Sequence, residues 1–208
     1  MASWSNRSVI GWSLYDWANS AFSLSVVTVF VPVLLAEFWS TGVDSTVTTF
    51  RLGMANGAAS LIVAVAAPLV GAIADRLERR KALLCILAGL GIVMTGALFF
   101  VARGQWEIAV ACYVLASVGF AGSNSLYDSL LVDVTSSDHF HEVSALGFGL
   151  GYIGGALLFA VNVWMVASPA TFGLESELEA IRIAFILVAI WWAVFSIPLL
   201  LWVHEHRE

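Results

Sequence analysis

Long apolar stretches dominate this chain and limit the folds that it can adopt. A helix that spans a membrane needs about 20 mostly apolar residues, and the sequence contains six such candidates. Hydrophobic residues make up 60% of the 208 residues and charged residues only 12%, whereas about 25% of a typical soluble domain is charged. We therefore predict an all-α integral membrane protein with one six-helix domain. The expected spans are approximately residues 11–38, 50–74, 82–102, 107–132, 144–167 and 180–203.

A short basic segment between the second and third stretches predicts the orientation of the chain. Residues 76–81 hold four of the nine Lys and Arg residues, and short connections rich in these residues stay in the cytoplasm. Following the chain from this segment assigns six basic residues to the cytoplasmic side. Only Arg51, Arg103 and Arg182 fall on the other side. Both termini are therefore predicted to be cytoplasmic.

Two of the stretches carry polar residues along one helical face. In the first stretch, Asp16, Asn19, Ser20 and Ser23 follow the spacing i, i+3, i+4, i+7, which places them on one side of a helix. Polar side chains within a membrane turn away from lipid, so the first and fourth helices are predicted to line a cavity. The polar residues of the fourth stretch are Ser117, Asn124, Tyr127 and Asp128.

The second and fifth stretches instead carry stripes of small residues. Such stripes let helix backbones approach closely, so these two helices are expected to pack tightly. The sixth stretch is bulky and apolar, which favours a position facing lipid. The stripes comprise Gly53, Gly57, Ser60, Ala64, Ala67 and Gly71 in the second stretch, and Ser144, Gly147, Gly151 and Gly155 in the fifth.

The basic segment also resembles a known motif. Residues 68–81 are similar to the signature turn of the major facilitator superfamily, roughly G-x-x-x-D-R-x-G-R-R, with Glu78 in place of the usual Gly. Three further segments, 15–22, 126–131 and 144–155, resemble the branch that contains vacuolar amino-acid effluxers and their bacterial relatives. The residues that match the signature turn are Gly71, Asp75, Arg76, Arg79 and Arg80.

This resemblance implies an architecture larger than one six-helix domain. Members of the superfamily usually contain two six-helix repeats, and this chain resembles the N-terminal repeat. The resemblance implies that helices one and four line the substrate cavity and that helices two and five face the other half. It also implies that the charges of the signature turn latch the cytoplasmic side of the outward-open state. The expected contacts with the other half are Gly53, Gly57, Gly147, Gly151 and Gly155.

The polar residues of helices one and four are the candidate binding residues. Asp16 suits coupling to a proton or cation, or contact with a substrate ammonium group; alternatively, it caps the helix at the interface or pairs with a basic residue of the turn. Asp128 suits the loading and release of a proton; alternatively, it is a structural hydrogen-bond acceptor for helix one. Asn19, Asn124 and Tyr127 either bind a polar substrate or hold the two helices together. Trp12, Trp17, Trp39 and Trp106 are interpreted as anchors at the membrane interface.

These observations favour a half-size secondary transporter in a bacterial or archaeal cytoplasmic membrane. Two copies, or this chain and a different half, would form a twelve-helix alternating-access carrier for a small polar solute such as an amino acid, with proton coupling as a further option. The alternatives are a non-transporting scaffold or regulatory subunit, and a truncated fragment. No enzymatic activity, cofactor, metal or nucleic-acid partner is expected. Four histidines form two His-x-His pairs that resemble metal ligands, but no cysteine ligands accompany them, so they are weak evidence for a metal site. They are His139, His141, His204 and His206.

Overall fold

The computed structural model describes residues 6–77 and 79–205, with the side chains of Asp75 and Leu77 outside this description. Six of the described helical segments are long and apolar enough to cross a membrane, which confirms the predicted fold class. The second span was expected to begin at Phe50 and begins at Ser45. The helices after the first span are α3 (Ser45–Leu77), α4 (Arg80–Ala97), α5 (Trp106–Ser129), α6 (Leu131–Val134), α7 (Phe140–Ala167) and α8 (Glu177–Trp202).

The first span is not a uniform α-helix. It begins as α1 (Arg7–Ala21), continues as a π-helix over Phe22–Phe30, returns to an α-helical turn in α2 (Val31–Leu34) and ends as a second π-helical segment over Leu35–Trp39. π-Helical geometry is rare and is found frequently at functional sites. The irregular middle of this span is therefore a place to look for function.

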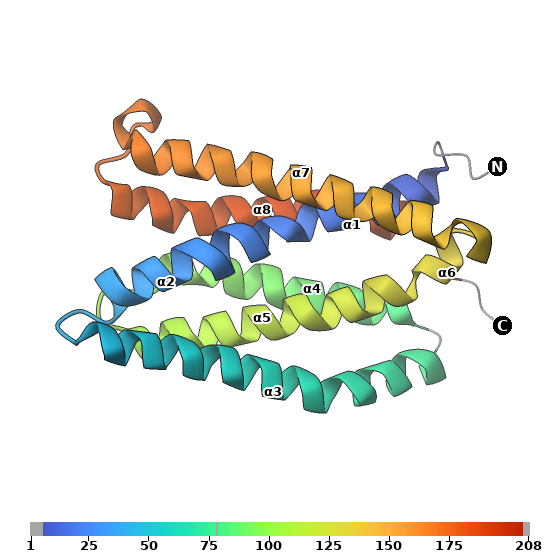
Figure 1. The fold of residues 1–208 in the computed structure, drawn as a ribbon, viewed down its shortest axis with the longest axis horizontal. Helices are drawn as coiled ribbons and strands as arrows, with labels where there is room; N and C mark the ends of the chain where they lie inside the picture. Colours follow the sequence, from blue (N-terminus) through green and yellow to red (C-terminus); the bar gives the residue numbers. More distant parts are fainter. Residues whose placement is uncertain (1–5, 78, 206–208) are drawn as a thin grey trace.

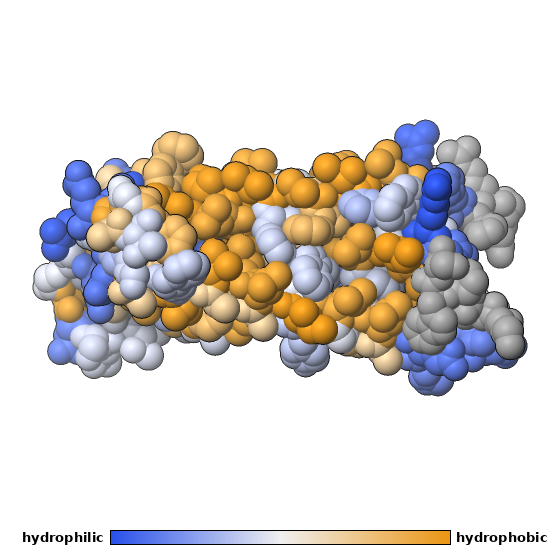
Figure 2. Space-filling view, turned by 90° about the horizontal axis from the view of Figure 1, so that it is seen from above, coloured by the Kyte–Doolittle hydropathy of each residue, from blue (hydrophilic) through white to orange (hydrophobic). Residues whose placement is uncertain are grey.

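The spans pack as two layers that meet through α1, α4, α5 and α8. Figure 1 shows α7, α8 and α1 in one layer and α3, α4 and α5 in the other; α1 packs against α7 and α8, and α5 packs against α3 and α4. The first and last described residues lie at the same end, together with the α3–α4 connection and α6. Figure 2 shows a hydrophobic band between two hydrophilic ends, as a membrane-spanning bundle requires.

Glycines at the contact between α4 and α5 allow the two backbones to touch. A Cβ on Gly119 would lie 2.5 Å from the backbone nitrogen of Gly91 and 2.6 Å from the carbonyl oxygen of Leu87. The fully buried ring of Trp192 from α8 also packs on Gly91, where an added Cβ would lie 2.5 Å from its Cη2. The glycines therefore let α4 pack closely against both the α5 backbone and a large aromatic side chain.

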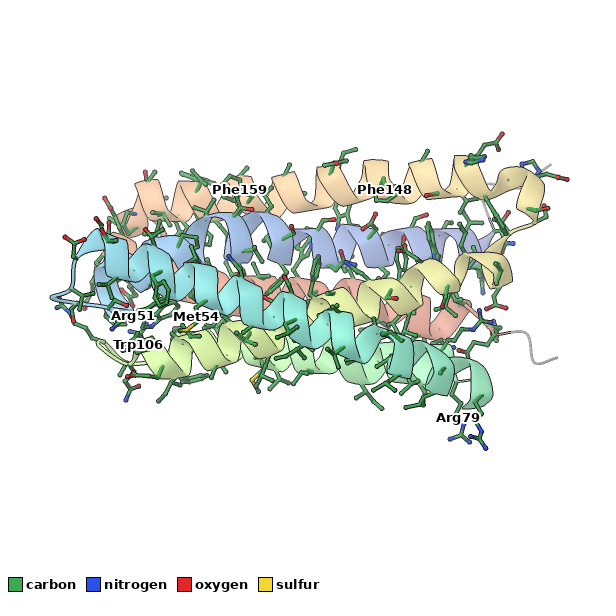
Figure 3. The ribbon with its side chains drawn as sticks, turned by 60° about the horizontal axis from the view of Figure 1, so that its bottom comes forward. Arg51, Met54, Arg79, Trp106, Phe148 and Phe159 are labelled. Atoms are coloured by element: carbon green, nitrogen blue, oxygen red, sulfur yellow. The ribbon has the colours of Figure 1, made fainter. Side chains whose placement is uncertain are left out.

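Polar groups define the helix ends away from the α3–α4 connection. Asp44 caps α3, because its Oδ1 accepts a hydrogen bond from the backbone nitrogen of Thr46 at 2.8 Å. This hydrogen bond holds the pKa of the exposed Asp44 carboxyl below its usual range. Arg51 of α3 lies over the ring of Trp106, 3.8 Å from its centroid, and Figure 3 shows the pair beside Met54 at this end. This cation–π contact joins the N-terminal ends of α3 and α5.

Two of the tryptophans interpreted as interfacial anchors belong to the core instead. Trp39 is fully buried and stacks on Phe185. Trp12 is 3% exposed and donates a hydrogen bond from Nε1 to the carbonyl oxygen of Tyr127 at 3.0 Å. The prediction was wrong for these two residues because the sequence indicates the depth of a residue in the membrane but not the direction in which its side chain points.

Candidate functional site

The polar face of α1 lies against the glycine stripe of α7. A Cβ on Gly151 would lie 2.8 Å from Ser20 Oγ and 3.0 Å from Asp16 Oδ2. One turn further along α7, a Cβ on Gly155 would lie 3.2 Å from Cβ of Ser20. The bare backbone of α7 therefore leaves the space in which the half-buried Asp16 carboxylate and the Ser20 hydroxyl lie.

This polar contact opens into a groove beside the middle of the first span. The groove has a volume of about 180 Å³, and its walls come from the end of α1, from the π-helical segment that follows it and from α7. Thr28 donates a hydrogen bond from Oγ1 to the carbonyl oxygen of Ser23, five residues earlier, at 2.9 Å. The lining residues are Ser20, Ser23, Leu24, Thr28, Gly151, Tyr152 and Gly155.

The candidate residues of α5 lie near this polar face, and two of them are held by structural contacts. Asn19 donates a hydrogen bond from Nδ2 to Asn124 Oδ1 at 2.7 Å, which joins α1 to α5. Tyr127 is 4% exposed, and its ring stacks on Trp12 with a centroid separation of 4.3 Å. Of the two alternatives for these residues, the structure favours the one in which they hold the helices together.

Asp128 is the candidate residue of α5 that remains accessible. Its side chain is exposed at the last turn of α5, close enough to Asp16 for the two carboxylates to interact electrostatically. Both carboxylates also act on the Tyr127 hydroxyl, which lies 3.0 Å from the position of a Cβ on Gly147. The two aspartates thus share one neighbourhood between α1, α5 and α7.

The glycines assigned to the contact with another half occupy two different environments. Gly147, Gly151 and Gly155 of α7 are buried against α1 within this six-helix domain. This corrects the expectation that these three form the contact with a second half. Gly53 and Gly57 of α3 are exposed, and a Cβ on either would meet no atom within 4 Å, so they stay available for that contact.

The residues of the signature turn also differ from one another. Arg80 forms an ion pair with Asp133 at 2.8 Å and donates a hydrogen bond to the carbonyl oxygen of Ser129 at 2.9 Å. Arg76 and Arg79 are exposed, and Figure 3 shows Arg79 pointing away from the bundle. Gly71, in α3, meets no atom within 4 Å of an added Cβ. The latch role assigned to Asp75 falls on a side chain outside the described part of the chain.

Sequence reasoning passed over Trp12 as a site residue and also missed Asn56. Asn56 accepts a hydrogen bond from the Tyr113 hydroxyl at 2.6 Å, which ties α3 to α5. It was missed because it is a single polar residue among small ones. The signal that could have found it is its position one residue before Gly57, within the small-residue stripe.

Comparison with known proteins places this integral membrane protein in a family. The model of the Major Facilitator Superfamily matches residues 17–208. The uncharacterized MFS-type transporter YxiO of Bacillus subtilis is 34% identical over 93% of this chain and 46% of the relative. Autophagy-related protein 22 of Eremothecium gossypii is 26% identical over 94% of this chain and 46% of the relative. No solved structure matches.

The chain therefore belongs to the Major Facilitator Superfamily, as the signature turn indicated. It spans about half the length of the curated relatives that it matches, 46% of each of these two. The six spans found here agree with one six-helix repeat of that fold.

The hydrogen bond between Asn19 and Asn124 gives a first testable prediction. We expect a coupling free energy of about 0.6 kcal/mol, the average for polar contacts between helices within a membrane. A double-mutant cycle with Asn19→Ala, Asn124→Ala and the double variant measures it from the free energy of unfolding in mixed micelles. Additive effects of the two single variants would show that the hydrogen bond adds no stability.

Proposed function

We propose that this six-helix domain is one half of a secondary transporter of the alternating-access type. It pairs with a second copy, or with another six-helix half, and the two halves enclose a small polar solute such as an amino acid near the middle of the membrane. Membership of the superfamily and the half-length match to two relatives support this proposal.

The groove beside the first span carries the proposal. It holds three hydroxyl side chains near the middle of the first span, with the Asp16 carboxylate beside it at Gly151, and a polar group within the membrane is expensive unless it has a partner or a function. A scaffold that only holds other proteins has no need for such a surface. A carrier needs one, because its solute must exchange water for protein polar groups.

Exposed apolar residues on α3 and α7 support pairing with another half. On α3, Leu61 and Val65 are 66% and 63% exposed, and on α7 Tyr152, which also lines the groove, is 80% exposed. A second half placed over these helices would cover them and close the groove from lipid. The glycines of α3 that face outward, Gly53 and Gly57, would let that half approach closely.

We place the end that contains Asn6 and the α3–α4 connection in the cytoplasm. The structure brings Arg7 to the same end as the basic segment 76–81, which agrees with the concentration of Lys and Arg in cytoplasmic connections. Asp16 and Asp128 then lie in the cytoplasmic third of the membrane. In that position they can exchange a proton or cation with the cytoplasm when the carrier opens inward.

Solute uptake tests this proposal. The purified protein is reconstituted into liposomes preloaded with a mixture of unlabelled amino acids, and exchange of a labelled mixture is followed. We expect exchange with the wild-type protein and at least a roughly tenfold loss with Ser23→Phe, because a bulky ring fills a groove of about 180 Å³. Native mass spectrometry in lipid nanodiscs is expected to show the dimer.

A matched variant separates blockage from damage. Val93 of α4 is 60% exposed and does not line the groove, so Val93→Phe adds the same ring without filling the groove. We expect normal exchange with this variant. A wild-type dimer that exchanges no solute with any amino acid would contradict the self-paired carrier, and a monomer would direct the search to a different half.

A further inference from the structure

A carboxylate lies beside the groove, and the residues that line the groove carry no positive charge. The Asp16 carboxylate lies at Gly151, which lines the groove, and Asp128 is close enough to interact with it. None of the residues that line the groove is Lys, Arg or His. The Lys and Arg residues that the structure describes lie at or near helix ends: Arg7, Arg51, Arg76, Arg79, Arg80, Lys81, Arg103 and Arg182.

The hydroxyl groups of the groove present acceptors more than donors. Thr28, which lines the groove, uses its hydroxyl proton in the hydrogen bond to the carbonyl oxygen of Ser23, so its oxygen can only accept a further hydrogen bond. The Ser20 hydroxyl and the Asp16 carboxylate lie beside the same point of α7, because a Cβ on Gly151 would be 2.8 Å from Ser20 Oγ and 3.0 Å from Asp16 Oδ2. Both groups offer oxygen lone pairs to a donor at this point. A ligand group that donates several hydrogen bonds fits this surface best.

An ammonium group has this chemistry, since it offers three donors and a positive charge. Charge-assisted hydrogen bonds to a carboxylate are about twice as strong as neutral ones. A carboxylate ligand would instead bring a like charge toward Asp16, which disfavours its binding. We infer that the groove binds the ammonium end of a small amine-bearing solute through Asp16, Ser20 and Ser23.

This inference deepens the proposed transport function and rests on it. It also assigns the two ends of an amino acid to different halves of the carrier. The ammonium group binds to this half, and the carboxylate binds to the other half, because no positively charged residue lines the groove of this half. The volume of about 180 Å³ equals that of roughly six water molecules at about 30 Å³ each. That space suits an ammonium group with a few carbons rather than a bare metal ion.

Equilibrium binding tests the inference without transport. The purified protein in detergent is titrated calorimetrically with matched ligands on two carbon skeletons: isopentylamine, 4-methylpentanoate and leucine, and then phenethylamine, 3-phenylpropionate and phenylalanine. The amines are expected to bind and the acids to bind at least tenfold more weakly. Equal affinities for amines and acids, or no binding of the amines at millimolar concentration, would overturn the inference.

Three variants assign the binding to the groove. Asp16→Asn keeps the side-chain volume and removes the charge, so we expect at least a tenfold loss of amine affinity. Ser23→Ala is expected to reduce the affinity a few-fold. The exposed Asp138 lies outside the six long helices, and Asp138→Asn is the matched control, with unchanged affinity. Retention of wild-type amine affinity by Asp16→Asn would refute the assignment.

A sodium ion could share the carboxylate, so the titrations are run in both NaCl and KCl. We expect the same amine affinity in the two salts. Strong stabilisation by Na⁺ alone, with loss of amine binding, would identify a sodium site and overturn the ammonium assignment. Amine binding by a protein that exchanges no solute would contradict the proposed transport function and leave this inference standing. Solute exchange with a preference for acids would support the proposed transport function and overturn this inference.

Discussion

Replacement of Gly119 by alanine is expected to cost about 3 kcal/mol of unfolding free energy, at the upper end of the usual cost of overpacking. The added Cβ would lie 2.5 Å from the backbone nitrogen of Gly91 and 2.8 Å from its Cα. Backbone atoms of α4 cannot swing aside as the end of a long side chain can. The two helices must therefore separate, and the gap reduces their contact along the whole α4–α5 pair.

Trp192 makes the expected loss larger than a local clash would suggest. Its fully buried ring packs on the same glycine of α4, Gly91, so a shift of α4 away from α5 also disturbs the packing of this ring. Phe22 and Phe120 also contact this ring, at centroid separations of 5.6 and 6.0 Å. A shift of α4 would therefore disturb the aromatic contacts that join the π-helical part of the first span, α5 and α8.

Gly149 supplies the matched control for this prediction. It is an exposed glycine in the interior of α7, and an added Cβ would meet no atom within 4 Å. Gly149→Ala should cause no loss of stability, because alanine is the better helix former by about 1 kcal/mol. Both variants are compared by unfolding in mixed micelles, followed by tryptophan fluorescence. Equal stability of the two variants would contradict the tight α4–α5 contact.

Much of this fold follows from the sequence because the membrane imposes one strong constraint. Apolar stretches of about 20 residues must become helices when lipid surrounds them, so six spans were predicted and six were found. The change to π-helical geometry over Phe22–Phe30 could not be predicted in this way. Apolar composition is the same for α and π geometry, and the choice depends on contacts with neighbouring helices.

The candidate site was predictable in composition but not in arrangement. The i, i+3, i+4, i+7 spacing identified Asp16, Ser20 and Ser23 as one face, and the structure keeps Asp16 and Ser20 together at Gly151. The partner of that face could not be predicted, because small residues permit close approach without specifying which helix approaches. The α7 stripe met α1 of the same domain, whereas the glycines of α3 stayed exposed.

For the four charged residues of the signature turn as well, the sequence predicted the composition but not the arrangement. As a motif, Asp75, Arg76, Arg79 and Arg80 carry equal weight, and the sequence offers no way to rank the three arginines. The structure separates them by position: Arg80 begins α4 and reaches Asp133 beyond α5, whereas Arg76 and Arg79 are exposed. The role of each arginine depends on the helix to which it belongs. Within a helix, neighbouring side chains point in directions that differ by about 100°.

Replacement of Arg80 by alanine is therefore expected to destabilise the domain far more than replacement of Arg79. The Asp133 side chain in the ion pair is only 3% exposed, and removing one partner from a buried ion pair costs about 3 kcal/mol or more. The variant also loses the hydrogen bond from Arg80 to the carbonyl oxygen of Ser129, the last residue of α5. Arg79→Ala alters an exposed side chain, so its effect should stay within about 0.5 kcal/mol.

A third variant distinguishes the ion pair from a general effect of charge. If the cost arises from the Arg80–Asp133 contact, the double variant Arg80→Ala/Asp133→Ala should be more stable than the sum of the two single variants predicts. The reason is that the double variant removes both charges of the pair, whereas each single variant removes only one. Unfolding in mixed micelles at low and high salt measures all four proteins. A pair with 21% and 3% exposure of its side chains is screened less than a surface pair, so the difference should persist in salt. Equal losses for Arg79→Ala and Arg80→Ala would instead mean that the basic segment acts only through its total charge, as the positive-inside rule alone requires.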